Sequence, residues 1–194
     1  MTSAYEIVQA RDRILDEFGH PDLVVVAAGV RRAAPFEQAI PADWTAMLAT
    51  NLRGLLQTVQ IFACDVLAAG DRGERADIVL TSSAPARERQ AAYSVFSSIG
   101  ASIGQFSRHL RAEYGPRGVR VHHLSSIYIA GSFFAASNYG SNRDTSDHHD
   151  ILQNDPDSIA WIDTEHVASE VGFMTSLPAH VNLASATVLP IGNR

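Results

Sequence analysis

Short, almost wholly apolar runs bounded by turn residues constrain the fold of this 194-residue chain more than any other feature. The first run is DLVVVAAGV, from Asp22 to Val30, and the second is DIVLTSS, from Asp77 to Ser83. A continuous apolar run of this length is typical of a strand that is covered on both faces, as in a parallel sheet. We expect two further strands, one from Gly118 to Ser126 and a short one from Ala186 to Leu189.

Helical patterns separate these strands. Apolar residues recur at helical spacing from Tyr5 to Phe18, from Pro41 to Ala69, from Ala91 to Tyr114 and from Thr164 to Ser176. In the last of these helices we expect Thr164 to be the N-cap. Residues 135–157 are polar, and we expect them to form a loop. This alternation predicts an α/β fold with a parallel sheet, in one domain that spans residues 1–194.

Composition excludes some classes of partner. The formal net charge of −6 argues against binding to nucleic acid, which requires clustered positive charge. We recognise no signal peptide and expect no membrane span. Cys64 is the single cysteine, which excludes an intramolecular disulfide and favours a cytoplasmic location. A small-molecule substrate, a protein partner or both are the partners that remain.

Several segments, in this order and spacing, resemble the short-chain dehydrogenase/reductase family along almost the entire chain. FGHPDLVVVAAGV resembles the segment that ends in the family's Asn-Asn-Ala-Gly turn, and WTAMLATNLRG resembles the helix that carries its structural asparagine, here Asn51. DIVLTSS and AAYSVFSS resemble the segments of the catalytic serine and tyrosine, which places them at Ser83 and Tyr93. LRAEYGPRGVRVHHL, EHVASEVGFMTSLP and VLP resemble the family's later helices and strands.

The sequence departs from the family at the positions that would hold a dinucleotide. It has no opening strand with the Gly-rich turn that holds the cofactor pyrophosphate in the family. The lysine of the family's Tyr-x-x-x-Lys is Ser97, the Pro-Gly step is Ser126-Ile127, and the chain contains no lysine at all. The resemblance therefore implies a partial Rossmann-like, doubly wound parallel sheet that lacks the N-terminal strands of the dinucleotide-binding half. We assign no cofactor-binding residue, no cofactor and no metal.

The origin of the missing strands has two interpretations. Because the altered positions lie well inside the chain, we expect divergence rather than a misplaced start. An upstream start remains the alternative, since Thr2 sits where many members have the threonine of an Asp-Val-Thr turn.

The resemblance implies that Ser83, Tyr93 and Asn51 are the catalytic candidates. Without the lysine, the phenol of Tyr93 has its ordinary titration range and is a better proton donor than base at neutral pH. The separation of Ser83 and Tyr93 is also about three residues shorter than is common in the family. The alternative is that all three residues are inherited and structural, with Asn51 tying its helix to a neighbouring strand.

Other polar residues have weaker functional interpretations. Asp147-His148-His149-Asp150 has ligand types that suit a metal, although adjacent residues in a polar loop are more often solvated. His122 and His123 lie on a strand whose alternation sends one to each face. Arg31-Arg32 is a surface pair or a site for an anionic substrate or partner.

The strand Leu23–Ala28 becomes a sheet edge when the family's first strand is absent. A free edge beside an apolar sequence is a combination that natural proteins cover. Losing part of the burial of Leu23, Val24, Val25 and Val26 would cost several kcal/mol at ~1.5–3 kcal/mol for each side chain. We therefore expect a homo-oligomer, or a hetero-oligomer with a protein of the same family.

Three functions follow as competing hypotheses. The first is a non-redox pseudoenzyme subunit that completes or stabilises a biosynthetic enzyme, by assembling with itself or with a full-length relative. The second is a cofactor-free dehydratase, isomerase or cyclase that uses Tyr93 and Ser83. The third is an oxidoreductase subunit that depends on a partner chain for NAD(P).

Overall fold

The computed structural model describes residues 1–83, 92–126, 129 and 162–191. Its elements, in chain order, are the helix α1 (Ala4–Phe18), the strand β1 (Leu23–Val26), the helix α2 (Pro41–Met47), the π-helix η2 (Leu48–Gly54), the helix α3 (Leu55–Asp71), the strand β2 (Asp77–Ser83), the helix α4 (Ser94–Tyr114), the strand β3 (Arg120–Ser126), the helix α7 (Thr164–Ser176) and the strand β4 (Ser185–Val188). Short 3-10 turns occupy Phe36–Gln38 and Gly115–Arg117.

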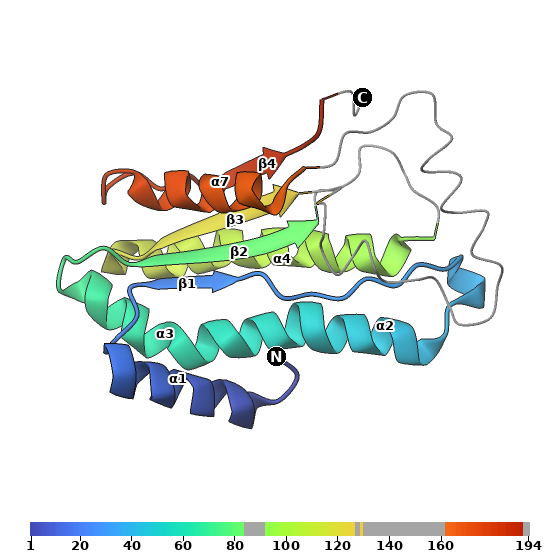
Figure 1. The fold of residues 1–194 in the computed structure, drawn as a ribbon, viewed down its shortest axis with the longest axis horizontal. Helices are drawn as coiled ribbons and strands as arrows, with labels where there is room; N and C mark the ends of the chain where they lie inside the picture. Colours follow the sequence, from blue (N-terminus) through green and yellow to red (C-terminus); the bar gives the residue numbers. More distant parts are fainter. Residues whose placement is uncertain (84–91, 127–128, 130–161, 192–194) are drawn as a thin grey trace.

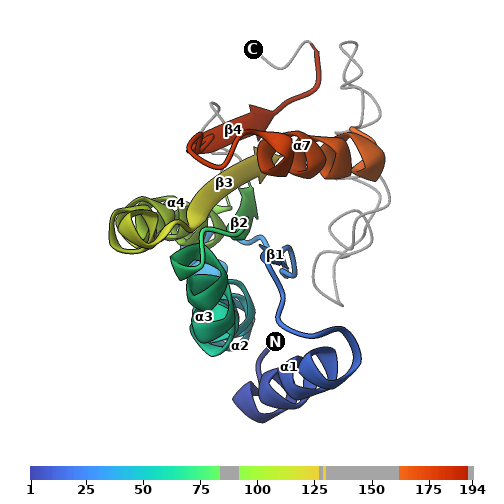
Figure 2. The same ribbon diagram turned by 90° about the vertical axis from the view of Figure 1, so that its left-hand side faces the viewer.

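The four strands form one parallel sheet in the order β1-β2-β3-β4 (Figure 1). Helices α3 and α4 cover one face of the sheet, and α7 covers the other (Figure 2). Strand β1 is one edge of the sheet, as predicted. The α/β class and the partial Rossmann-like sheet are confirmed.

The core on the α3 and α4 side is the larger of two apolar clusters. Its centre is formed by residues that are almost fully buried, namely Leu55, Val59, Val66, Ile78, Leu80 and Val121. The cluster on the α7 side is smaller and is built around Val79, Leu124 and Met174. Side chains alternate between the two faces along each strand, so β2 sends Ile78 and Leu80 to one cluster and Val79 to the other.

The helix predicted from Pro41 to Ala69 is one continuous helical segment, Pro41–Asp71. It consists of α2, η2 and α3. Taken together, Pro41–Asp71 is long and apolar enough to cross a membrane by length and composition. However, Leu55, Val59 and Val66 face the sheet and are buried there, so core packing accounts for the apolar composition.

Several predicted boundaries were wrong by a few residues. The strand predicted over 22–30 pairs only over Leu23–Val26, because Val30 forms hydrogen bonds with the side chain of Asn51 in place of a strand. Helix α4 begins at Ser94, because Ala92 has a φ of 73°, which no helix accepts. Asp163, in extended backbone, precedes α7, so Thr164 is the first helical residue and not the N-cap.

Candidate functional site

Polar residues gather at the carboxyl ends of β2 and β3. Ligands of parallel α/β folds bind at this end of the sheet. The register places Ser82 opposite Ser125 and Ser83 opposite Ser126. Four hydroxyl side chains therefore lie in two adjacent pairs at the carboxyl ends of neighbouring strands. Hydroxyl groups of this kind donate and accept hydrogen bonds, as a substrate alcohol or carbonyl requires.

Ser82 belongs to a small hydrogen-bonded cluster under α4. Its Oγ lies 2.8 Å from Nε2 of His123 and 3.4 Å from Oγ of Ser125. The imidazole of His123 packs against Gly104, where an added Cβ would lie 3.2 Å from Cε1. Burial lowers the pKa of His123, and the nearby positive charge of Arg111 lowers it further. The ring is therefore neutral near pH 7 and holds the end of β2 in place.

Sequence reasoning missed this cluster. The strand alternation predicts only that His122 and His123 point to opposite faces of the sheet, and no motif singles out Ser82. The sequence did contain a signal, because Ser-Ser ends both strands, at Ser82-Ser83 and at Ser125-Ser126. The two strands run parallel in one sheet, so the two pairs meet once the register is known.

Ser83 ends β2 as predicted and lies against the second turn of α4. An added Cβ at Gly100 would be 3.4 Å from the carbonyl oxygen of Ser83. Gly100 follows Tyr93 by seven residues, which is about 10 Å along the helix axis. The structure thus brings Ser83 to α4 about two turns away from Tyr93.

Tyr93 occupies the position before the first helical residue of α4. Its ring meets Phe96 edge-on, with 6.5 Å between ring centroids, and the guanidinium carbon of Arg31 lies 5.3 Å from its centroid. The separation from Ser83 that is common in the family falls at Phe96, three residues further along. Tyr93 therefore lies about one helical turn before the position at which the usual spacing in the family would place the tyrosine.

Asn51 is buried inside the π-helix and binds the loop after β1 with both ends of its amide. Its Oδ1 accepts the Val30 N–H at 2.8 Å, and its Nδ2 donates to the Val30 carbonyl at 2.7 Å. This is the tie between helix and strand end that the structural alternative expected. In this geometry Asn51 positions backbone.

The remaining sequence candidates are Ser97, His122 and the segment 147–150. Ser97, at the lysine position, is exposed, and its N–H donates to the Tyr93 carbonyl at 2.8 Å. His122 is buried at the other end of the sheet, with Nε2 3.0 Å from Oδ1 of Asp77. Asp147-His148-His149-Asp150 lies outside the described residues, as does Ile127. Within the described ranges, no group of three or more His, Cys, Asp or Glu side chains is placed to hold a metal.

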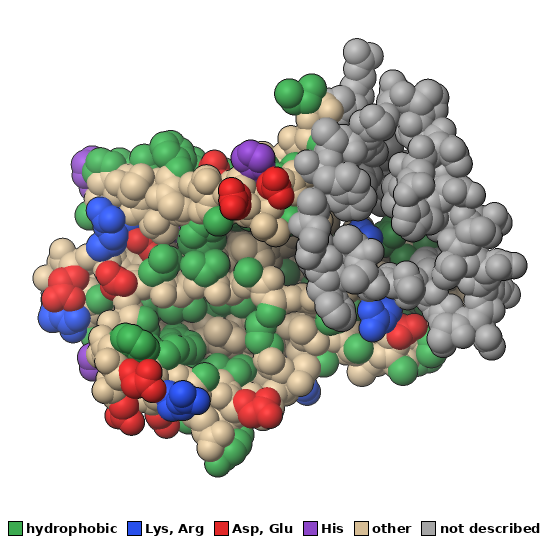
Figure 3. All heavy atoms as spheres, viewed as in Figure 1, with side chains coloured by type: hydrophobic (Ala, Val, Ile, Leu, Met, Phe, Trp, Pro, Cys, Tyr) green, Lys and Arg blue, Asp and Glu red, His purple; other side chains and the backbone are tan. Residues whose placement is uncertain are grey.

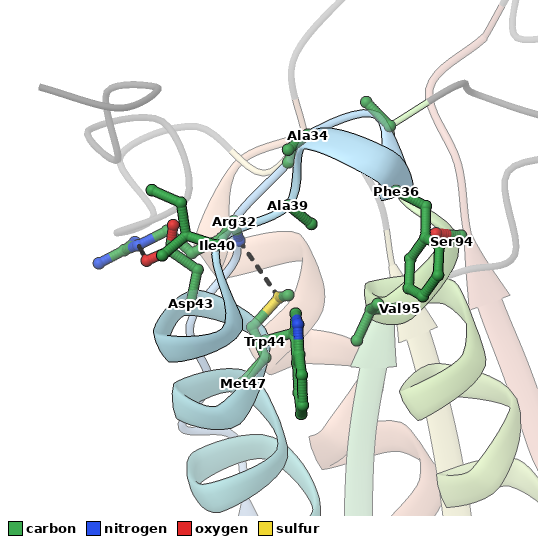
Figure 4. Close-up of a pocket in the computed structure, with 12 residues that line it drawn as sticks. Arg32, Ala34, Phe36, Ala39, Ile40, Asp43, Trp44, Met47, Ser94 and Val95 are labelled. Atoms are coloured by element: carbon green, nitrogen blue, oxygen red, sulfur yellow. Dashed lines mark hydrogen bonds and ion pairs between the residues drawn. The ribbon is translucent and has the colours of Figure 1, made fainter. Parts of the chain in front are cut away.

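A shallow hollow opens beside Tyr93, since Ala92 and Ser94 are among its lining residues, and it has room for little more than one water molecule. Trp44 and Met47 of α2 face Val95 of α4 across it, and Arg32 and Asp43 lie at one side (Figure 4). Its lining is mostly apolar.

The described residues do not include the turn that holds the pyrophosphate of a dinucleotide. The pyrophosphate of such a cofactor binds a Gly-rich turn that leads into a helix N-terminus. In the described part of the chain, β1 is followed by Ala27-Ala28-Gly29 and a loop, and the next α-helix begins only at Pro41. No reaction step through a dinucleotide is therefore derived from these residues.

The chain is similar in sequence to known dehydrogenases. The chain is 35% identical over 131 residues to D-threitol dehydrogenase of Mycolicibacterium smegmatis, a match that covers 66% of this chain and 48% of the relative. It is 28% identical over 178 residues to serine 3-dehydrogenase of Rhizobium radiobacter, covering 91% of this chain and 66% of that one. The matches thus span about half to two thirds of the length of these relatives.

A solved structure, the closed form of serine dehydrogenase complexed with NADP+, has the same fold. Its TM-score is 0.83 at 22% identity, and the match covers 98% of this chain and 73% of that one. At this identity the likeness concerns the fold alone.

The relatives correct one expectation. The non-redox pseudoenzyme was the leading hypothesis, because the lysine position is Ser97 and the Gly-rich turn is absent. The relatives are dehydrogenases, and they support the third hypothesis, a subunit with NAD(P)-dependent oxidoreductase activity. The altered residues at these positions therefore do not exclude the class of reaction that the relatives carry out.

The comparison with protein families gives the same assignment over most of the chain. The model of the short chain dehydrogenase family matches residues 1–140, which include α1 to β3 and all three catalytic candidates. This chain is a member of the short-chain dehydrogenase family.

Proposed function

We propose that this chain is a subunit of a nicotinamide-dependent oxidoreductase and supplies the substrate side of its site. The observation that carries the proposal is the match to D-threitol dehydrogenase, at 35% identity over 131 residues of this chain. The substrate class is an alcohol or its carbonyl product, as the names of the relatives suggest. A cytoplasmic location is part of this proposal.

The chain's own residues have two roles in it. The phenol of Tyr93 donates a hydrogen bond or proton to the substrate oxygen, and the hydroxyl of Ser83, about two helical turns away, binds a second hydroxyl of the substrate. The cluster of Ser82, His123 and Ser125 fixes the strand end that carries Ser83. A nicotinamide dinucleotide held by residues outside the described ones would supply the hydride acceptor for this reaction.

The cofactor pyrophosphate must then be held by residues outside the described chain, and the free edge of β1 supports this. Leu23 and Val25 are 38% and 42% exposed, whereas Val24 and Val26, on the α3 side of the same strand, are buried. Figure 3 shows hydrophobic side chains between α7 and α1, on the face where β1 runs. A parallel sheet is normally covered on both faces, so this face suits a further strand and helix.

The position of α1 agrees with this arrangement. α1 packs beside α3, and Arg11 of α1 binds the buried carboxylate of Asp65 on α3 at 2.6 and 2.9 Å. Connections between parallel strands are right-handed, and α3 and α4 cross between successive strands on this same face. Under that rule, any strand that leads into α1 lies on the outer side of β1.

Titration with NADH and NADPH tests the proposal, with binding followed by nicotinamide fluorescence. We expect the isolated 194-residue chain to bind either dinucleotide weakly at most, and its native assembly to bind one of them and oxidise an alcohol. An assembly that binds neither dinucleotide would refute the proposed function. Tight binding by the isolated chain would refute the need for residues outside it.

A further inference from the structure

The loop of residues 30–34 is attached to one face of the helical segment that α2 and η2 form. The attachments come from side chains that are spaced four residues apart and therefore lie on the same face, namely Asp43, Met47 and Asn51. Asn51 holds the start of the loop, since its amide binds both the N–H and the carbonyl of Val30, at 2.8 and 2.7 Å. The loop then runs back toward the N-terminal end of α2.

Arg32 is attached to α2 through both its backbone and its side chain. Its N–H donates to Sδ of the buried Met47 at 3.3 Å (Figure 4), and its Nε lies 3.7 Å from Oδ1 of Asp43. The guanidinium also donates to the carbonyl of Arg31 at 3.1 Å. Arg32 therefore fixes the middle of the loop and the peptide that precedes it.

The far end of the loop is bound to the residue before Tyr93. The Ala34 N–H donates to the carbonyl of Ala92 at 2.9 Å. Ala92 has a φ of 73°, in the left-handed region that is unfavourable for a residue with a Cβ. Such a conformation persists only where surrounding contacts hold it. The hydrogen bond from Ala34 is a contact of this kind, because a change in φ would swing the carbonyl that accepts it.

We propose that Arg32 is a positioning residue for Tyr93, because it fixes the loop that holds Ala92 in its left-handed conformation. The inference rests on the proposed function, in which the phenol of Tyr93 donates to the substrate oxygen. Arg32 acts through the loop backbone and is not a catalytic residue. A small displacement of the phenol is enough to slow the reaction, since proton transfer requires hydrogen-bond distance.

The exposure of the Arg32–Asp43 pair separates this role from a role in overall stability. The two side chains are 38% and 46% exposed, and ion pairs at such sites contribute little to the free energy of unfolding. Removing the guanidinium should therefore leave the urea midpoint of unfolding almost unchanged. The effect that we expect is local, on the loop and on Tyr93.

Fluorine NMR of the whole chain, labelled with fluorotyrosine, tests the inference without relying on activity. The substitution Tyr93→Phe identifies the Tyr93 signal among those of the five tyrosines. We expect Arg32→Met to shift the Tyr93 signal by more than its linewidth. Asp43→Asn removes the same ion pair from the helix side and should shift the signal in the same direction. Arg32→Lys, which can still pair with Asp43, should stay closer to the wild type.

The substitution Ala92→Gly separates positioning from a direct effect of the lost charge. Glycine adopts positive φ about as readily as negative φ, so residue 92 then keeps its conformation without the help of the loop. Added to Arg32→Met, Ala92→Gly should return the Tyr93 signal toward its wild-type position. A direct effect of the charge would not be reversed in this way.

Kinetics of the native assembly with D-threitol as the probe give a second readout. We expect Arg32→Met to lower kcat about tenfold with little change in KM, because the proton donor is displaced while substrate binding is retained. The double variant with Ala92→Gly should recover most of this loss.

Arg72→Met is the matched control, because Arg72 also forms an exposed ion pair, with Glu74 at 2.6 Å, but at the far end of α3. It should leave the Tyr93 signal in place. Circular dichroism checks that each variant is folded, and Asp43→Asn decides the test if Arg32→Met does not fold. The inference is overturned if the loop variants leave the Tyr93 signal at its wild-type position, or if Ala92→Gly does not return a shifted signal.

The outcome is distinct from that of the proposed function. A displaced Tyr93 signal in a protein whose native assembly oxidises no alcohol would leave the role of Arg32 in placing Tyr93 and refute the oxidoreductase. Alcohol oxidation by the assembly, with an unmoved Tyr93 signal in Arg32→Met, would do the reverse.

Discussion

At the scale of single residues, the side chains that hold the site in place form hydrogen bonds within the chain. Asn51 uses its whole amide on Val30, and His123 is held among Ser82, Ser125 and Gly104. Sequence reasoning located Asn51, Ser83 and Tyr93 through their motifs. It did not find the Ser82–His123 pair, because those residues lie 41 positions apart and meet only through the strand register.

Ala92 is strained, and relieving the strain should stabilise the chain. It is the one non-glycine residue with positive φ in the described part of the chain, at 73°. A left-handed backbone costs a residue with a Cβ roughly 1–2 kcal/mol. We expect Ala92→Gly to raise the free energy of unfolding by about 1 kcal/mol, measured in urea. A loss of stability would show that the methyl group makes contacts that outweigh the strain.

The half-buried His123 should make stability depend on pH near neutrality. Its pKa is lowered in the folded state, so the unfolded chain binds more protons once pH falls below about 6.5. The stability that the neutral ring contributes is therefore present above that pH and is lost as pH falls toward the folded pKa. We expect thermal unfolding between pH 8 and 5 to show a smaller slope for His123→Gln than for the wild type. Equal slopes would contradict a neutral His123 ring in the folded chain.

At the scale of elements, periodicity predicted which segments are helices and strands, and tertiary contacts set their ends. β2 matches its predicted bounds. Its apolar run lies between Asp77 and the polar residues that end with Ser83, and it is paired with a strand on each side. β1 is shorter than its apolar run, because pairing stops where Asn51 takes over the Val30 backbone. The π-helix within Pro41–Asp71 was not predictable, since periodicity does not distinguish one wide turn.

The attachment of α7 to the sheet depends on Arg120 of β3. Its guanidinium binds both oxygens of Asp77, at 2.7 and 2.6 Å. It also donates to carbonyl groups at the C-terminal end of α7, those of Thr175 and Leu177, at 2.9 and 2.7 Å. Burial raises the pKa of Asp77, but hydrogen bonds from His122 and Arg120 outweigh it and hold that pKa below its usual range.

Removing this arginine should therefore be costly. We expect Arg120→Met to lower the free energy of unfolding by ~3–5 kcal/mol, because it leaves the Asp77 carboxylate buried without its main partner. Arg117→Met is the control, since the exposed pair of Arg117 with Asp71 should matter little. Chemical denaturation of both variants makes the comparison. Similar small losses in the two would show that Arg120 does not anchor α7.

At the scale of the whole molecule, the described strands form a parallel sheet in which β1 is an edge strand, and the candidate site lies at the carboxyl ends of β2 and β3. The apolar face at Leu23 and Val25 was predicted from sequence, because the run of valines required cover on both sides. The partner that provides this cover could not be predicted, since nothing in the chain encodes its identity.

Assembly should depend on that face. We expect the native assembly to exceed the 21.0 kDa of the single chain, and Val25→Arg to shift the mass to 21.0 kDa without unfolding it. Phe173→Arg, at a 54% exposed site on α7, should leave the assembly intact. Light scattering after size exclusion measures the masses. A wild-type protein of 21.0 kDa would exclude the predicted oligomer.

The most direct test uses the chain purified under mild conditions from the cells that produce it naturally, as wild type and as Tyr93→Phe. Alcohol oxidation is followed by the appearance of reduced nicotinamide, with hydroxy acids and polyols as substrates. The account predicts activity that depends on NAD or NADP in the wild type, and a loss of about a hundredfold or more in Tyr93→Phe. It would be contradicted by a wild-type assembly without such activity, or by a Tyr93→Phe variant that retains full activity.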